Sequence, residues 1–304
     1  NSFPFNPLPY PFLFPFSFIH FIMSPPAGKA KTENKCGPLG KIMNRAPAFT
    51  VGSQFFRKAF TIMTEKLSKN LMKNIEQIKK LLPVGTSFDL ITRELFLGDA
   101  KSYFLGINGF CRTEILQQIF ADLQNPWYTK DSQVEDIVRY MNAKIGYAQV
   151  SLTGIWEDIL KNVLSGPCAL FIDGFDQAIL IDVRSYPTRG IAEPDAEKVT
   201  RGARDGFVET LLFNANLIRR RVRSPHLCFA MHSIGSESKT DVAVAYLRCS
   251  VNENLLEALS KSIDSLKVTS LTMGAKSLEE LLVKKRWWNP LPSIRVTERP
   301  DIAC

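Results

Sequence analysis

Residues 184–223 read RSYPTRGIAEPDAEKVTRGARDGFVETLLFNANLIRRRVR, and this stretch organises the rest of the chain. Its first part holds two prolines and three glycines among many charged residues, which predicts a long loop. Its second part carries apolar residues at helical spacing, from Phe207 to Val222, and ends in a run of arginines. The pattern therefore predicts a loop that leads into one long helix, from Asp205 to about Val222.

The two ends of this predicted helix have simple structural interpretations. Asp205 is expected to cap the first turn and Gly206 to ease it. Arg219, Arg220 and Arg221 lie where the helix dipole favours positive charge, so a helix end or a contact with an acidic partner is favoured. Anion binding by the TRGARDG segment and nucleic-acid binding by the arginine run are weaker alternatives.

The SYPTRG segment and the residues after it are expected to form an internal ionic network. A proline restricts the residue before it to extended or turn geometry, and acidic residues follow within reach of several arginines. Paired arginines and carboxylates of this kind would order a loop across a domain surface. The residues concerned are Arg184, Tyr186, Pro187, Arg189, Glu193, Arg201 and Arg204.

Mixed helices and strands are predicted on both sides of this stretch, so the fold class is α/β, with α+β as the alternative. A hairpin is expected around Gly98-Asp99 and another around Asp173-Gly174. The predicted helices span residues 64–82, 113–123, 132–142, 151–164, 254–266 and 277–285. The predicted strands span residues 88–97, 101–107, 147–150, 168–172, 178–183, 227–234 and 240–247.

No residue pattern points to a metal, a cofactor or a catalytic centre. Asp173, Asp176 and Asp182 could hold a divalent cation, but an Asp173-Gly174 turn is the better interpretation. His226 and His232 lack a partner at a recognised spacing, so satisfied or surface histidines are expected. The six cysteines form no CxxC pair, which favours free thiols in a reducing compartment.

The excess positive charge lies at the start of the chain. Of a net +8 over 304 residues, residues 1–62 contribute seven basic residues against one acidic residue, and 31 basic against 29 acidic residues follow. This weakens the case for nucleic-acid binding. Residues 1–62 are also rich in proline and phenylalanine, and we expect a disordered or non-native leader there. No apolar run reaches the length that spans a bilayer.

Two long segments are similar to a known family. FIDGFDQAILIDVRSYPTRGIAEPDAEKVTRGARDGFVETLLFNANLIRRRVRSPHL and SKTDVAVAYL resemble the A subunits of spore germinant receptors, the GerA family. VGTSFDLITREL, FLGINGF and KRWWNPLPSIRVTERPD look most like the stage V sporulation protein AF branch of that family. The resemblance covers about residues 84–303.

The resemblance implies two small α/β subdomains followed by a membrane domain that this chain lacks. We expect subdomains at 63–145 and 146–286, and a linker at 287–304 that would lead into the membrane. It also implies a non-enzymatic protein of the spore inner membrane, whose soluble part faces the cytosol and assembles with other germination subunits in gating an ion pathway. A sensor that binds a small ligand or an anion through Arg184, Arg189, Arg201 and Arg204 is the rival hypothesis.

Overall fold

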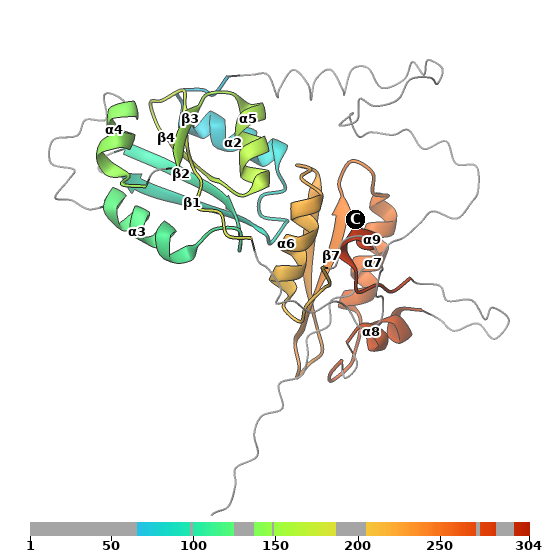
Figure 1. Cartoon of the computed structure of the whole chain (residues 1–304). Helices are drawn as coiled ribbons and strands as arrows, with labels where there is room; N and C mark the ends of the chain where they lie inside the picture. Colours follow the sequence, from blue (N-terminus) through green and yellow to red (C-terminus); the bar gives the residue numbers. More distant parts are fainter. Residues whose placement is uncertain are drawn as a thin grey trace, which may run out of the picture.

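A computed structural model describes residues 66–97, 100–124, 137–147, 149–186, 205–271, 274–283 and 295–304 (Figure 1). The expected leader, residues 1–62, lies wholly outside these residues. So does most of the expected ionic network, because Pro187, Arg189, Glu193, Arg201 and Arg204 are not among them. No helix within the described ranges has both the length and the apolar character needed to cross a bilayer.

The first half of the fold is a five-stranded antiparallel sheet in the order β1-β2-β4-β5-β3. The expected hairpins are confirmed, since β1 pairs with β2 and β4 pairs with β5. Alternate side chains of a strand point to opposite faces, so each central strand contributes to two cores. The strands are β1 (Leu90–Leu97), β2 (Ala100–Ile107), β3 (Val150–Thr153), β4 (Cys168–Ile172) and β5 (Ala178–Ile181).

Helices cover both faces of this sheet (Figure 1). Helices α2 (Leu71–Leu81) and α5 (Trp156–Ser165) share one core with Leu105 and Phe171 of the sheet. Helices α3 (Thr113–Gln124) and α4 (Ile137–Lys144) lie over the other core, which contains Phe104, Leu170 and Ile172. The fold is therefore mixed α/β in three layers, as the predicted fold class requires.

Two expected helices begin later than their apolar spacing suggested. The first begins at Leu71, because Lys66 forms a backbone bridge to Ile155 and the side chain of Asn70 caps the helix. The helix expected from residue 151 begins at Trp156, because residues 150–153 pair with β5 as a strand. In both places hydrogen bonds to distant segments outweigh local helical periodicity.

The second half is a two-stranded antiparallel sheet between helices. Strands β6 (Leu227–Ile234) and β7 (Thr240–Leu247) have the bounds expected from the sequence and pair as an antiparallel hairpin. Leu227 and Phe229 face α6 (Leu211–Arg221) in one core. Ile234, Val242 and Val244 face α7 (Glu253–Asp264) and α8 (Ala275–Leu282) in another core.

The subdomain boundary expected near residue 145 is wrong. Strands β3, β4 and β5 follow that position, yet they belong to one sheet with β1 and β2, and Leu105 of β2 pairs with Ala169 of β4. The change from one sheet to the other falls between β5 and β6. We propose that the chain divides between β5 and α6 instead of within the first sheet.

The helix expected from Asp205 begins only at Leu211. Residues 205–210 precede it without helical structure, because the Phe207 N–H donates to the Glu298 carbonyl (2.7 Å) and the Asn214 side chain binds the backbone of Val208. The roles predicted for Asp205 as the cap and Gly206 in the first turn are therefore wrong. Gly206 is buried ahead of the helix.

The expected linker 287–304 ends in structure. Its described part contains a short helix, α9 (Pro300–Ala303), which packs against α6. Pro300 and Ala303 are buried there, and Arg299 forms an ion pair with Asp301 (2.5 Å). Proline at the first helical position and an ion pair in the first turn explain why this short segment is ordered on α6.

Candidate functional site

A buried ion pair between Arg219 and Asp89 joins α6 to the segment that precedes β1. The guanidinium Nε donates to the Asp89 carboxylate (2.8 Å), and the side chains are 1% and 0% exposed. The two other guanidinium nitrogens donate to the carbonyls of Ser224 and Leu227, both at 2.9 Å. A buried arginine is tolerated because every charged nitrogen has an acceptor.

Asp89 is held in turn by the strand of the opposite sheet. The Ser87 hydroxyl donates to the Asp89 carboxylate and accepts a hydrogen bond from the Phe229 N–H (2.9 Å). The guanidinium carbon of Arg219 lies 5.3 Å from the centre of the Phe229 ring. We call these four residues, Ser87, Asp89, Arg219 and Phe229, the arginine junction. It connects the segment before β1 to α6 and β6 through buried polar contacts.

Tyr186 forms a second contact across the same interface. Its hydroxyl donates to the Ser165 carbonyl at the end of α5 (2.5 Å), and its ring meets Phe110 edge to face at 5.3 Å. The guanidinium of Arg220 lies over the other part of the ring at 5.5 Å. Tyr186 is thus anchored in the first sheet's core and contacts the basic end of α6.

The interface also includes a close backbone approach. Gly109 has a φ of +78°, and a Cβ atom on it would lie 2.4 Å from the side-chain nitrogen of Asn216 in α6. Asn216 is buried, and neither of its amide atoms has a hydrogen-bond partner among the residues that the structure describes. Only glycine fits this loop position while the Asn216 side chain stays where it is.

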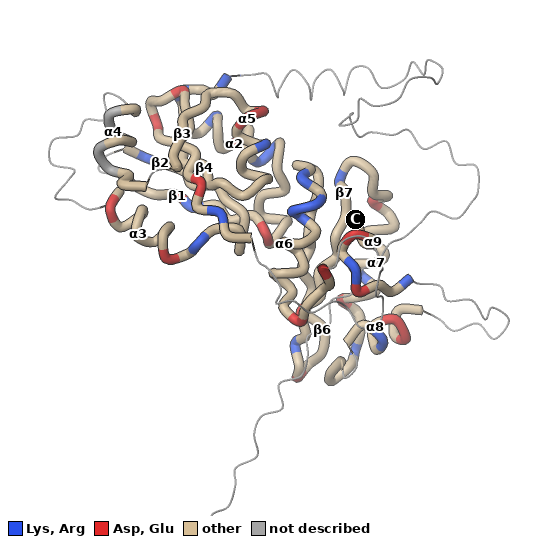
Figure 2. Tube along the Cα trace, viewed as in Figure 1, with Lys and Arg blue, Asp and Glu red and all other residues tan. Residues whose placement is uncertain are grey.

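The remaining arginine of the run is paired within the chain. Arg221 forms an ion pair with Asp205 (2.6 Å), and this hydrogen bond holds the pKa of Asp205 below its usual value. Figure 2 shows the basic residues gathered at one end of α6. Arg219, Arg220 and Arg221 therefore each contact a group of this chain, which supports the helix-end interpretation over the nucleic-acid one.

The Asp173-Gly174 turn is structural, as predicted. Gly174 has a φ of +90°, which suits a tight turn. The Asp173 carboxylate accepts a hydrogen bond from the Leu71 N–H (2.9 Å), so it stabilises the positive end of the α2 dipole. Within the described ranges, no group of three or more histidine, cysteine or acidic residues is placed to hold a metal ion.

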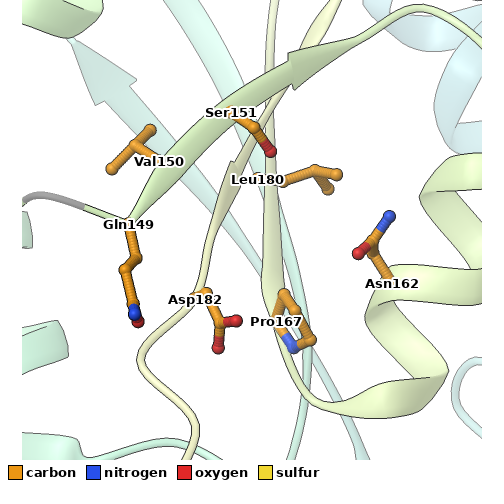
Figure 3. Close-up of a pocket in the computed structure, with 7 residues that line it drawn as sticks. All are labelled: Gln149, Val150, Ser151, Asn162, Pro167, Leu180 and Asp182. Carbon is orange, nitrogen blue, oxygen red and sulfur yellow. The ribbon is translucent and has the colours of Figure 1, made fainter.

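Arg184 is paired with Asp182 and is not an open anion site. Its Nε and a terminal nitrogen donate to the two carboxylate oxygens at 2.7 and 2.5 Å. Asp182 also borders a cavity of about 240 Å³, where side chains from β3, α5 and the end of β5 face one space (Figure 3). The lining residues are Gln149, Val150, Ser151, Asn162, Pro167, Leu180 and Asp182.

The histidines have partners or burial that explain them. His232 contacts Asp264 of α7 at 2.8 Å. Burial, and then the charge of Arg248, lower the pKa of His226. Neither residue lies in the arginine junction.

Sequence reasoning missed Asp89, Ser87 and Asn216 as interface residues. Asp89 and Ser87 lie within the segment VGTSFDLITREL, which carries part of the family resemblance. A lone acidic residue directly before an apolar strand was the available signal. Its partner is 130 positions away, so no local spacing could reveal the pair.

The fold has a solved counterpart. It is similar to the N-terminal domain of the A subunit of the Bacillus megaterium spore germinant receptor GerK3, with a TM-score of 0.58 and 22% sequence identity. The likeness covers 79% of this chain and 88% of that chain. The two chains therefore share a fold.

The sequence comparison gives the family. Residues 76–304 match the family described as Bacillus/Clostridium GerA spore germination protein, and the chain belongs to this family. It is 37% identical to stage V sporulation protein AF of Bacillus subtilis (strain 168) over 239 residues, 79% of this chain and 48% of that protein. It is 26% identical to spore germination protein KA of the same organism, over 78% of this chain and 43% of that protein. The chain spans about half the length of these relatives.

Proposed function

We propose that this chain is the cytosol-facing part of a membrane protein that acts in the response of spores to germinants, through assembly with other germination subunits and gating of an ion pathway. Its membership of the GerA family supports a role in spore germination. A relative that is 27% identical is named an uncharacterized membrane protein, YfkQ of Bacillus subtilis, which is consistent with a membrane location. We propose the inner membrane of the spore as that location, and a non-enzymatic role.

The arginine junction is the observation that carries the gating part of this proposal. It joins two separately packed sheets through a fully buried ion pair, which lies beside the edge-to-face contact of Phe88 with Phe229. Such a contact is sensitive to small displacements, because a buried charge that loses its partner costs several kcal/mol. An interface of this kind favours two discrete arrangements over gradual deformation.

Helix α9 gives a physical route from the end of this chain to the junction. It packs on α6, and α6 carries Arg219 on its last turn. The Phe207 N–H to Glu298 carbonyl bond ties the segments that precede both helices. A displacement of whatever follows α9 would therefore reach α6 and the arginine junction.

A chimaera tests this function. Residues 76–304 would replace the matching half of Bacillus subtilis stage V sporulation protein AF, and spore germination would be followed by loss of optical density. We expect the chimaera to restore germination in spores that lack the native protein, and Arg219→Ala to abolish that restoration. Lys261→Ala is the matched control, since Lys261 forms only an exposed pair with Glu257. Immunoblots of spore membranes must show comparable levels of both variants.

Two outcomes would count against the proposal. One is full germination with Arg219→Ala at normal protein level, which would separate the junction from function. The other concerns the gene: a continuous reading frame beyond residue 304 is expected to encode several apolar runs of about 20 residues. Related genes that continue without any such run would contradict the membrane location.

A further inference from the structure

Two cysteine side chains far apart in sequence meet within the first sheet. The sulfur atoms of Cys111 and Cys168 lie 2.9 Å apart, and both residues are free thiols. A disulfide bond is about 2.05 Å long, so the two sulfur atoms need to approach by less than 1 Å to be linked. Cys168 is the first residue of β4, and Cys111 follows the turn after β2.

The backbone around these cysteines fixes both positions. Cys111 forms a bridge with Arg184, and the Arg112 N–H donates to the Val183 carbonyl (3.0 Å). Cys168 is paired with Ile181 of β5. Gly106 of β2 leaves the space that the Cys168 side chain occupies, since a Cβ atom there would lie 3.1 Å from its sulfur. The backbone pairing of both cysteines therefore brings the two thiols close together.

The two thiols differ in access and in proton affinity. Cys168 is fully buried, whereas Cys111 is half-buried. The hydrogen bond from Cys168 lowers the pKa of Cys111, and the same contact together with burial raises the pKa of Cys168. Cys111 is thus the thiol that solvent-borne reagents reach and the better nucleophile of the two, because the thiolate is the reactive form.

We propose that Cys111 and Cys168 are a modification site, at which a low-molecular-weight disulfide converts the two thiols into a reversible protein disulfide. The Cys111 thiolate attacks one sulfur of the reagent, forms a mixed disulfide and releases the first small thiolate. The Cys168 sulfur then attacks the Cys111 sulfur, releases the second small thiolate and gives up its proton. In sum, two protein thiols and one small disulfide yield one protein disulfide and two small thiols.

The bond would restrain residues 183–186, which follow β5. Cys111 is bridged to Arg184, the Ser185 N–H donates to the Phe110 carbonyl (2.7 Å), and Tyr186 packs on Phe110. Linking Cys111 to β4 therefore restrains the segment that carries Tyr186 to the edge of α6. This inference rests on the thiol geometry and is independent of the proposed function.

The test uses the full 304-residue chain in a Cys304→Ser background, because Cys304 is an exposed free thiol that the reagent would also reach. The folded protein is incubated with bis(2-hydroxyethyl) disulfide, the free thiols are blocked, and the peptides are mapped by mass spectrometry. We expect a peptide pair linked through Cys111 and Cys168, with the loss of two hydrogen atoms, and its disappearance on reduction with dithiothreitol. The linked protein should also show a higher thermal midpoint than the reduced protein.

Single-cysteine variants separate the two steps. With Cys168→Ala, Cys111 should retain the hydroxyethylthio group, because no second thiol displaces it. With Cys111→Ala, Cys168 should stay unmodified in the folded protein. The proposal is overturned if the chain with both cysteines accumulates the Cys111 adduct, or if neither thiol reacts until the protein is denatured. Should Cys168→Ala fail to fold, the peptide map of the chain with both cysteines decides alone.

Discussion

Asp89 and Arg219 form a fully buried ion pair, 2.8 Å across, between the first sheet and the helix that packs on the second. Asp89 directly precedes β1, and Arg219 lies in the last turn of α6. Because Ser87 and the carbonyls of Ser224 and Leu227 satisfy the other polar atoms, the pair fixes how the two halves meet.

Removing one partner of this pair should destabilise the chain strongly. We expect Arg219→Ala or Asp89→Ala to lower the free energy of unfolding by about 3–5 kcal/mol, because each leaves an uncompensated buried charge. Urea unfolding followed by circular dichroism measures the change. Lys261→Ala, which removes an exposed i,i+4 pair, should cost no more than about 0.5 kcal/mol. Similar decreases in the free energy of unfolding for Arg219→Ala and Lys261→Ala would show that the buried ion pair stabilises the chain no more than the exposed one.

Gly109 and Gly85 offer a matched comparison of two glycines with positive φ. Alanine at Gly85 meets no atom within 4 Å, so we expect a cost of about 1–2 kcal/mol from the backbone conformation alone. Alanine at Gly109 would also overlap Asn216 and should cost roughly 1–3 kcal/mol more. Asn216→Ala combined with Gly109→Ala should recover much of that excess. Equal costs at Gly85 and Gly109 would place α6 further from the loop than described.

The hydroxyl and the ring of Tyr186 should each contribute to the free energy of unfolding. Tyr186→Phe keeps the contact with Phe110 but removes the hydrogen bond to Ser165, so we expect a loss of about 1 kcal/mol in the free energy of unfolding. Tyr186→Ala should cost roughly 2 kcal/mol more, because the ring is lost as well. Thermal unfolding of both variants measures the two decreases in stability. If Tyr186→Phe were as unstable as Tyr186→Ala, the ring would make no contribution of its own.

The Asp205–Arg221 pair predicts a pH dependence. The folded pKa of Asp205 is depressed, chiefly by the hydrogen bond from Arg221, so its contribution is present above the unfolded pKa of about 3.9 and is lost as the pH falls through the folded value. Asp205→Asn should therefore lower the free energy of unfolding by roughly 0.5–1 kcal/mol near pH 7 and have no effect at the acidic limit. Denaturant titrations between pH 7 and the acidic limit check this. Glu257→Gln, at an exposed pair, should show little difference at any pH.

Much of the fold could be predicted from local patterns. The hairpins β1-β2, β4-β5 and β6-β7 follow from apolar runs separated by turn residues, and Asp173-Gly174 forms the turn that its residue types favour. Helix α3 begins at Thr113, as its apolar spacing indicates. These elements depend on neighbours in sequence, so periodicity and turn chemistry are enough to find them.

The candidate site could be predicted only in part. The residue pattern indicates a role for Tyr186 and for the arginines at the end of α6, but the capping role that it predicts for Asp205 and the first-turn role of Gly206 are wrong. Asp205 precedes α6, yet its carboxylate forms an ion pair with Arg221 in the last turn of that helix. This contact depends on where the helix begins. The start of α6 is set by Asn214 and Glu298, which bind the backbone of the preceding segment.

The sequence by itself therefore determined the elements, the turn at Asp173-Gly174 and the family resemblance carried by the segments around Arg184–Arg223. Tertiary structure alone decided that one sheet crosses residue 145, that Asp89 is the partner of Arg219, and that Cys111 meets Cys168. The physical reason is that each of these contacts joins residues tens of positions apart. The free energy of these contacts comes from burial and hydrogen bonding in the folded chain. The spacing of residues along the sequence does not reveal either of them.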